Sequence, residues 1–224
     1  GHDLGLSLTQ SVGKLAYDSA FASAVDTQTS RTEVSTVRLA STDQFTDAWQ
    51  SRLILGWQRD DSQFVETGAY GFDSRYASGN RMLTWSNRYA LNPQWKLSAG
   101  VDLQRQSIDT DDGFGGVYER SRRIDAVLAG AQGQLGASTL QINLRYDDID
   151  GIGGQPTGYL GWGLQLAPQW KLTASASTAF NAPPLGYLYA PYFGNPALQP
   201  EEARSAELGL QHAGAGHLLR ATLF

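Results

Sequence analysis

The sequence lacks cysteine and long apolar runs, and each absence excludes a class of protein. Without cysteine among its 224 residues, the chain has no disulfide, no thiolate nucleophile and no cysteine-based zinc site. No segment reaches the roughly 18–20 consecutive apolar residues that a membrane-spanning helix needs. The first residues also lack a basic segment followed by an apolar one, so we expect a signal peptide to be absent or already removed.

Charged residues are also few, and their signs are mixed. The chain has 17 Lys+Arg and 22 Asp+Glu, which gives a formal net charge of −5. Contacts with phosphate backbones require clustered positive charge, so we predict no nucleic-acid partner. The length and the 41% hydrophobic content would by themselves fit one ordinary soluble domain.

Catalytic motifs are missing as well. The three histidines are His2, His212 and His217, too few and too poorly placed to activate a serine nucleophile. The sequence contains no nucleophile elbow, phosphate-binding loop or paired-histidine zinc motif. We therefore predict no enzyme and no catalytic residue.

Three acidic groups, at residues 60–61, 109–112 and 147–150, raise the question of a metal site. Carboxylate oxygens in loops can hold Ca²⁺, but acidic loops are common on protein surfaces and no EF-hand spacing is present. We predict no metal ligands and no cofactor, with calcium bound in a loop as the open alternative.

The sequence does contain a strong alternation of apolar and polar residues. From Trp95 to Leu103 the odd positions are apolar, whereas the even positions are polar or small, and segments 140–147 and 170–178 repeat the pattern. Similar segments lie at 48–59, 81–91, 120–130, 158–166, 205–211 and 217–224, with weaker ones at 4–12 and 31–40. Successive side chains of a strand point to opposite faces, so we predict an all-β chain of about eleven strands.

The connections between these segments alternate in length. Short turns at 92–94, 132–136, 167–169 and 214–216 alternate with polar loops at about 60–80, 109–119, 148–157 and 180–204. This pattern, together with strands of ten residues or more, favours an antiparallel transmembrane β-barrel. Soluble sandwiches, propellers and barrels share the alternation and stay open at this point.

Tryptophans support the membrane interpretation. Trp49, Trp95 and Trp170 each follow a short turn. Aromatic rings at a fixed depth near strand ends form the interfacial girdle of a membrane barrel. The polar positions are rich in Ser, Thr, Gln, Gly and Asn, which suits a wet barrel interior better than a solvated outer surface.

One block is more specific than the periodicity. Residues 177–189 read STAFNAPPLGYLY and residues 193–201 read FGNPALQPE. The block resembles the segment of TonB-dependent outer-membrane receptors in which a strand runs into an extracellular loop, and its first part is most similar to the cobalamin (vitamin B12) receptor branch. Residues 100–106, 116–119 and 123–130 resemble the strand, loop and strand before it. The residues that match the family motif are Asn195, Pro196, Leu198, Pro200 and Glu201.

Prolines and aromatic residues define the expected behaviour of this loop. Pro183, Pro184, Pro196 and Pro200 fix φ and remove backbone donors, so residues 181–200 cannot form a regular central strand. A rigid loop with aromatic side chains suits a large, partly apolar ligand, although each ring could equally pack the loop onto its neighbours. The predicted ligand-binding residues of the loops are Tyr70, Phe72, Tyr76, Tyr118, Tyr187, Tyr189 and Tyr192.

The resemblance implies an active transport receptor in the bacterial outer membrane. Its expected partners are cobalamin or a similar large ligand, the lipid bilayer, and TonB, which supplies energy through a plug domain. No segment of the chain resembles a plug, and plugged barrels have about 22 strands. We therefore expect residues 1–224 to be part of a receptor barrel, with the plug and the C-terminal strands outside them. A siderophore or other TonB-dependent receptor, and a passive porin-like pore, are the alternatives.

Overall fold

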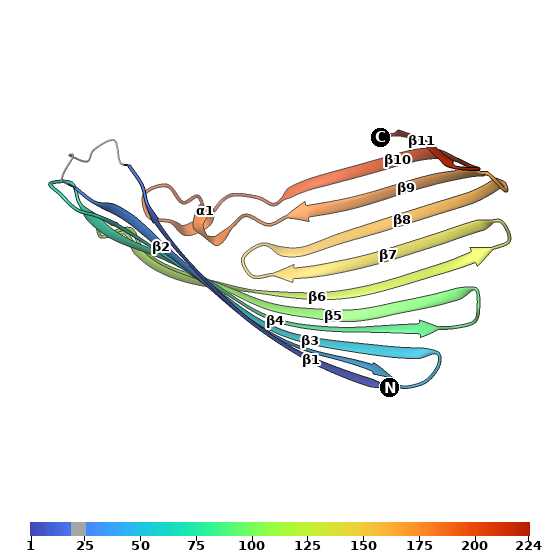
Figure 1. Ribbon diagram of the computed structural model, residues 1–224, viewed down its shortest axis with the longest axis horizontal. Coiled ribbons are helices and arrows are strands. Elements are labelled where there is room, and N and C mark those ends of the chain that lie inside the picture. Colours follow the sequence, from blue (N-terminus) through green and yellow to red (C-terminus); the bar gives the residue numbers. More distant parts are fainter. Residues whose placement is uncertain (19–25) are drawn as a thin grey trace.

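The computed structural model describes residues 1–18 and 26–224, and these form one curved, twisted antiparallel sheet (Figure 1). Each strand pairs with the next along the chain, so the order across the sheet is β1 to β11. A short helix, α1 (Leu185–Tyr189), lies between β9 and β10. The prediction of an all-β antiparallel fold with about eleven strands is confirmed. The strands are β1 (His2–Ala16), β2 (Gln28–Gln44), β3 (Trp49–Glu66), β4 (Phe72–Ala90), β5 (Trp95–Asp111), β6 (Val117–Leu135), β7 (Ser138–Ile149), β8 (Gly153–Ala167), β9 (Trp170–Asn181), β10 (Glu201–Gly214) and β11 (His217–Leu223).

The short turns lie together at one end of the sheet, and the longer connections lie at the other (Figure 1). Trp49, Trp95 and Trp170 are the first residues of β3, β5 and β9, as predicted. Side chains fix two of these strand starts. Asn92 Oδ1 accepts the backbone N–H of Trp95 at 2.9 Å, and Thr46 Oγ1 accepts that of Trp49 at 3.1 Å. Such local bonds close the turn and let the strand begin at the tryptophan.

Three of the four predicted loops are wrong in extent. The connections span only residues 67–71, 112–116 and 150–152, because the adjoining strands continue into the predicted loops at 60–80, 109–119 and 148–157. These strand ends carry polar or charged residues on both faces, so the sequence contrast is lost although the backbone pairing continues. The fourth loop, now 182–200, is close to its predicted bounds and contains the prolines expected to exclude a strand.

Strand register gives the sheet one apolar face. Directly paired residues of adjacent strands share a face, and Leu6, Leu39, Leu55, Leu83 and Leu103 are paired in succession from β1 to β5. Four of them are among the exposed large hydrophobic residues, with Leu6 65% exposed. An exposed apolar surface of this extent needs a partner other than water. We call this side the apolar face.

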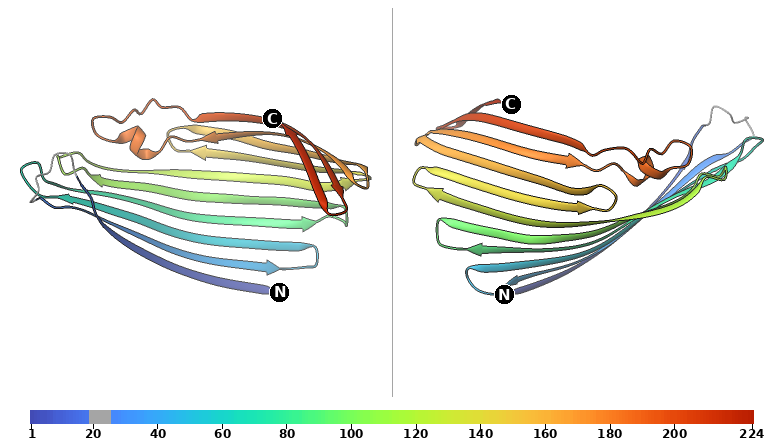
Figure 2. Two further views of the ribbon diagram at one scale, coloured as in Figure 1. Left: turned by 45° about the horizontal axis from the view of Figure 1, so that its top comes forward. Right: turned by 180° about the vertical axis from the view of Figure 1, so that it is seen from behind.

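The opposite side, the polar face, carries hydrogen-bonding side chains in the same register. One row runs across five strands and consists of Thr36, Gln58, Asn80, Gln106 and Arg122. Figure 2 shows the curvature and twist of the sheet that carries both faces. Among the described residues, no helix is long and apolar enough to cross a membrane.

Candidate ligand-binding site

The loop 182–200 folds over the polar face. It leaves β9, yet α1 contacts β5 and β6, which are separated from β9 in the sheet by β7 and β8. Leu185 and Leu188 of α1 are 7% and 5% exposed, so burial of two leucines holds the helix against the sheet. The loop therefore covers the end of the polar face that carries the longer connections.

Arg122 on β6 fixes this loop in place. Its Nε donates to Oε1 of Gln106 at 2.7 Å, and its Nη1 donates to the carbonyl oxygen of Pro183 at 2.7 Å. The arginine is 8% exposed. Burial of a guanidinium group costs free energy unless its N–H donors are bonded. These two contacts therefore fix the first residues of the loop against β6.

The family-motif residues shape the second half of the loop. The backbone N–H of Asn195 donates to the carbonyl of Tyr187 at 2.8 Å, and Asn195 Oδ1 accepts the N–H of Ala197 at 3.0 Å. Glu201 opens β10, where its Oε2 accepts a bond from Asn181 Nδ2 at 3.4 Å. Pro196 and Pro200 have no backbone N–H group, so they cannot donate a strand hydrogen bond in this segment. The motif thus bonds the second half of the loop to α1 and leads into β10.

A cavity of about 380 Å³ lies between α1 and the sheet. On the sheet side it is lined by Gln58, Asn80, Gln106 and Arg122 of the polar row. Asn80 Oδ1 is buried and has no hydrogen-bond partner within the described part of the chain. Since buried acceptors are normally bonded, this oxygen is available to a donor on a ligand. The loop side is lined by Ala182, Pro184, Leu185 and Gly186.

Three of the predicted aromatic residues lie on or beside α1. Tyr187 is 65% exposed, and the ring of Tyr189 lies 5.5 Å from the guanidinium carbon of Arg120. Tyr118 is on β6 and not in a loop as predicted, and its hydroxyl would lie 3.6 Å from a Cβ atom at Gly186 of α1. Tyr192, beyond α1, is 88% exposed and has a φ of +70°.

The other three predicted residues lie at the β3–β4 end. Tyr70 is 77% exposed in the connection 67–71. Phe72 and Tyr76 were predicted in a loop, but both are on β4. They belong to two separate ring contacts, Phe72 with Phe114 at 5.3 Å and Tyr76 with Phe64 at 6.0 Å. The structure therefore divides the seven predicted residues into two groups.

Tyr17, just beyond β1, extends the second aromatic contact. Its ring lies 6.5 Å from Phe64, and its hydroxyl donates to Oε1 of Glu66 at 2.9 Å. Loss of solvent raises the pKa of the Tyr17 phenol, and the Glu66 carboxylate raises this pKa further. The phenol therefore stays a hydrogen-bond donor across the physiological pH range.

Further along the polar face, an ion-pair group links β5 and β7. Arg145 on β7 bonds to Asp102 on β5 and, through Nη2, to Asp147 at 2.8 Å. The Asp147 side chain is 5% exposed. A groove of about 370 Å³ follows toward β11 and presents charged side chains from three strands, Lys171, Glu207 and Arg220. The polar face thus carries a continuous hydrophilic surface.

The acidic group at 109–112 bonds to its own loop in the structure. Asp112 Oδ1 accepts the N–H groups of Phe114 and Gly116, both at 2.8 Å, and Asp111 Oδ1 accepts that of Gly113 at 2.9 Å. Within residues 1–18 and 26–224, no three His, Asp or Glu side chains are placed to hold a metal ion. The absence of a cofactor, with calcium in a loop as the alternative, stays a prediction.

Comparison with known proteins identifies the family. The model of the TonB dependent receptor-like β-barrel family matches residues 1–224. The chain belongs to this family. TonB-dependent receptors are outer-membrane proteins and form a transporter family, not an enzyme class, so the apolar face is the lipid-facing surface and the polar face lines the barrel interior. The long-connection end is accordingly the extracellular end.

Two curated relatives are named vitamin B12 transporter BtuB. The one from Vibrio cholerae serotype O1 is 33% identical over 163 residues, which cover 72% of this chain and 26% of the relative. The one from Vibrio vulnificus is 28% identical over 168 residues, which cover 74% and 27%. The aligned region thus spans about a quarter of these relatives.

Solved structures share the fold at low sequence identity. The ferric enterobactin receptor PfeA of Pseudomonas aeruginosa superposes with a TM-score of 0.78 at 15% identity, covering 98% of this chain and 42% of that one. The FrpB iron transporter of Neisseria meningitidis gives 0.77 at 14%, covering 99% and 41%. At such identities the match concerns the barrel fold alone.

Sequence reasoning missed the amide row and Arg122. Gln58, Asn80 and Gln106 look like ordinary polar positions of an alternating strand, and the strand register is needed to align them. The sequence signal that could have found them is an amide side chain at a polar position of each of three consecutive strands.

Proposed function

We propose that residues 1–224 form part of the barrel domain of an active transport receptor that binds cobalamin or a similar large ligand. Energy would come from TonB through a plug domain supplied by another part of the protein, so the barrel itself needs no cofactor. The 33% identity to a vitamin B12 transporter supports this ligand class. So does the loop block at 177–201, which resembles the cobalamin receptor branch.

The observation that carries the proposal is the row of amides beneath the loop. Gln58, Asn80 and Gln106 line one cavity, and each amide can both donate and accept hydrogen bonds. Such a row is complementary to a ligand with a rim of carboxamides, as a corrinoid has. The neighbouring Tyr118 and Tyr187 supply flat apolar surface for a planar macrocycle.

The second candidate is a receptor for an anionic ferric chelate. Arg120 lies beside the ring of Tyr189, and Arg122 lines the cavity wall, so two guanidinium groups lie at this end of the polar face. Guanidinium groups bind oxyanions through charge-assisted hydrogen bonds and stack on aromatic ligands. This arrangement favours a catecholate over a neutral ligand, so only the second candidate requires positive charge at the site.

Equilibrium binding to the full-length protein in detergent separates the candidates. Cyanocobalamin is expected to bind, and a ferric catecholate is expected not to compete with it. The variant Gln106→Leu should weaken cobalamin binding by about tenfold, because it removes a half-buried hydrogen-bonding group that lines the cavity. Gln134→Leu, on the same face at the turn end of β6, is the matched control and should bind normally.

Three outcomes would contradict the proposal. Tight binding of the ferric chelate alone would establish the second candidate. Equal losses for Gln106→Leu and Gln134→Leu would place the ligand elsewhere. Steady ion conduction by the full-length protein in a planar bilayer, without TonB, would indicate a passive pore.

A further inference from the structure

A row of arginines crosses the apolar face where its apolar band ends. Arg81 on β4 is paired with Arg105 on β5, and Arg105 is paired with Arg123 on β6. All three side chains are exposed. Directly paired residues have Cβ atoms about 4.5–5.5 Å apart, and like charges in this arrangement repel. The sheet therefore concentrates positive charge on a surface that faces the membrane boundary.

Most of this charge is not neutralised by the protein. Arg123 is paired with Asp125 on its own strand. Arg105 Nη2 donates only to the neutral Ser121 hydroxyl at 3.2 Å. Arg81 has neither an ion pair nor a side-chain hydrogen bond within the regions that the structure describes. The positive charge of the row is thus concentrated on Arg81 and Arg105.

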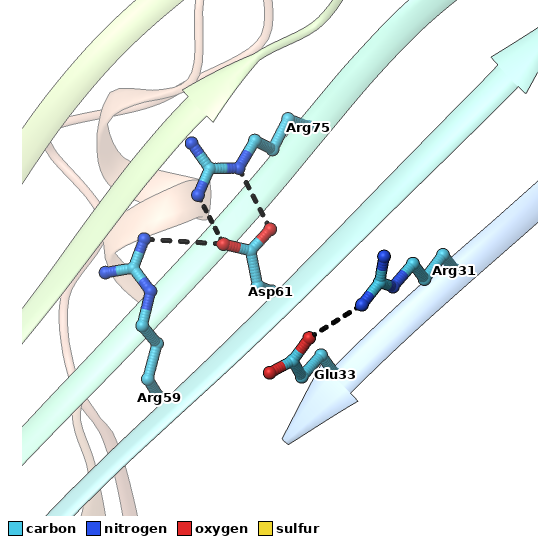
Figure 3. Close-up of polar contacts among 5 residues, drawn as sticks. All are labelled: Arg31, Glu33, Arg59, Asp61 and Arg75. Atoms are coloured by element: carbon cyan, nitrogen blue, oxygen red, sulfur yellow. Dashed lines mark hydrogen bonds and ion pairs between the residues drawn. The ribbon is translucent and has the colours of Figure 1, made fainter. Parts of the chain in front are cut away.

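A second arginine group on the same face behaves differently (Figure 3). Asp61 accepts bonds from both Arg59 and Arg75, and Glu33 is paired with Arg31 at 3.1 Å. In this group every guanidinium has a carboxylate partner. Arginines of this face are therefore neutralised by carboxylates at one place, whereas Arg81 and Arg105 have no carboxylate partner.

The position of the row relates it to the bilayer. Trp49 and Trp57 lie on the same face of β3, and eight residues of strand span about 26 Å, close to the roughly 25 Å apolar band of an outer-membrane barrel. Trp57 is paired with Arg81, so the arginine row lies at the extracellular edge of this band. The residues of the next row toward the turn end are apolar on β3, β4 and β5, namely Leu55, Leu83 and Leu103.

On the extracellular side of the row the surface is open. The next paired positions are Gly79, Ser107 and Ser121, all small. A ligand at the row would thus meet leucines on one side, two guanidinium groups without carboxylate partners in the middle, and small residues on the other side. This sequence of surfaces matches a lipid, with acyl chains, then an anionic group, then a polar headgroup.

We propose that Arg81 and Arg105, with Arg123 beside them, bind the phosphate of a phosphorylated lipid in the outer leaflet of the outer membrane. Guanidinium groups donate paired hydrogen bonds to phosphate oxygens. A dianionic phosphate offsets the repulsion within the row, and acyl chains cover the leucines below it. The site faces away from the barrel interior, so it is independent of the imported ligand.

Lipid binding to the full-length receptor tests the proposal. Diphosphoryl lipid A is titrated into the protein in neutral detergent, and binding is followed by native mass spectrometry. Arg81→Gln/Arg105→Gln should weaken binding by about 10- to 100-fold, through loss of charge-assisted hydrogen bonds. Arg81→Lys/Arg105→Lys keeps the charge and should retain most of the affinity. Arg59→Gln, which alters an arginine already paired with Asp61, is the matched control and should bind as the parent protein does.

Further measurements distinguish the lipid from other sources of binding. Dephosphorylated lipid A should bind weakly to the parent protein, and inorganic phosphate should compete only weakly, because it lacks the acyl chains. The proposal is overturned if the Gln double variant binds normally, if phosphate removal has no effect on the parent protein, or if inorganic phosphate displaces the lipid at equal concentration. Unchanged electrophoretic mobility of the unheated variants shows that each barrel is folded.

Discussion

The two faces of the sheet use the same backbone but face different surroundings. On the polar face, arginines are held by hydrogen bonds and ion pairs, as in the bonds of Arg122 to Gln106 and to the carbonyl oxygen of Pro183. On the apolar face, four of the five leucines in the row from Leu6 to Leu103 remain exposed. The difference indicates that hydrogen bonding organises one face and lipid contact organises the other, with no conventional core between them.

The largest expected effect comes from placing a charge on the apolar face. Val101 on β5 lies in the middle of the apolar band, in the row that contains Leu53 and Trp85. Val101→Arg should lower the free energy of unfolding in lipid bilayers by about 2–4 kcal/mol, the cost of arginine at the midplane. Urea unfolding in vesicles measures it.

Gln104→Arg, on the same strand but on the polar face, is the control for this variant. It should change the free energy of unfolding by less than about 1 kcal/mol, because the barrel interior solvates the guanidinium. Equal losses for the two variants would show that the faces do not differ in this way.

A smaller effect is expected from an ion pair on the polar face. Arg145→Met leaves the carboxylates of Asp102 and Asp147 without their shared cation. A fully buried pair loses about 3–5 kcal/mol when one partner is removed. Here about 2 kcal/mol is expected, because the Arg145 side chain is 37% exposed. Chemical unfolding at neutral pH measures the loss.

Two further variants isolate the cause of that loss. Asp147→Asn combined with Arg145→Met should recover part of the stability, since one of the stranded charges is removed. Arg123→Met breaks an exposed pair with Asp125 and should cost less than about 1 kcal/mol. If Arg145→Met costs no more than Arg123→Met, burial does not strengthen the pair on the polar face.

The aromatic girdle gives a third test, again on the apolar face. Trp95 is paired with Gly133, and a Cβ at that glycine would collide with the indole ring. Gly133→Val should destabilise the barrel by about 1–2 kcal/mol through overpacking, whereas Ala131→Val, one position along the face, should be tolerated. Adding Trp95→Ala to Gly133→Val should remove the penalty, and purely additive losses would show that the ring does not occupy this space.

Much of the fold could be predicted because alternation is a local property. Trp49, Trp95 and Trp170 mark strand starts in the sequence, and all three open strands in the structure. The strand ends could not be predicted, because at Asp61 and Asp109 polar residues occupy the apolar face outside the lipid. Only strand pairing, which is a long-range property, shows that the sheet continues there.

The candidate site was harder to predict, for the same physical reason. Pro183 and Pro184 indicated a rigid loop, which the structure contains, but the folding of this loop onto β5 and β6 depends on Arg122, whose partners are distant in sequence. The short helix α1 has no apolar periodicity of its own, and burial of Leu185 and Leu188 against the sheet stabilises it. The amide row exists only once the register is known.

The smallest expected effect concerns the neutralised arginines at the extracellular end of the apolar face (Figure 3). Arg59→Gln removes one contact of 3.4 Å to Asp61, which keeps its bonds to Arg75. Exposed pairs contribute little because water and salt screen them, so the free energy of unfolding should fall by less than about 0.5 kcal/mol. Asp61→Asn, which leaves two arginines without a carboxylate, should cost more, up to about 1 kcal/mol. Both losses should shrink in urea unfolding at high salt, whereas that of Arg145→Met should largely persist. A salt-independent loss for Arg59→Gln would mean that this group is as protected from solvent as the polar face.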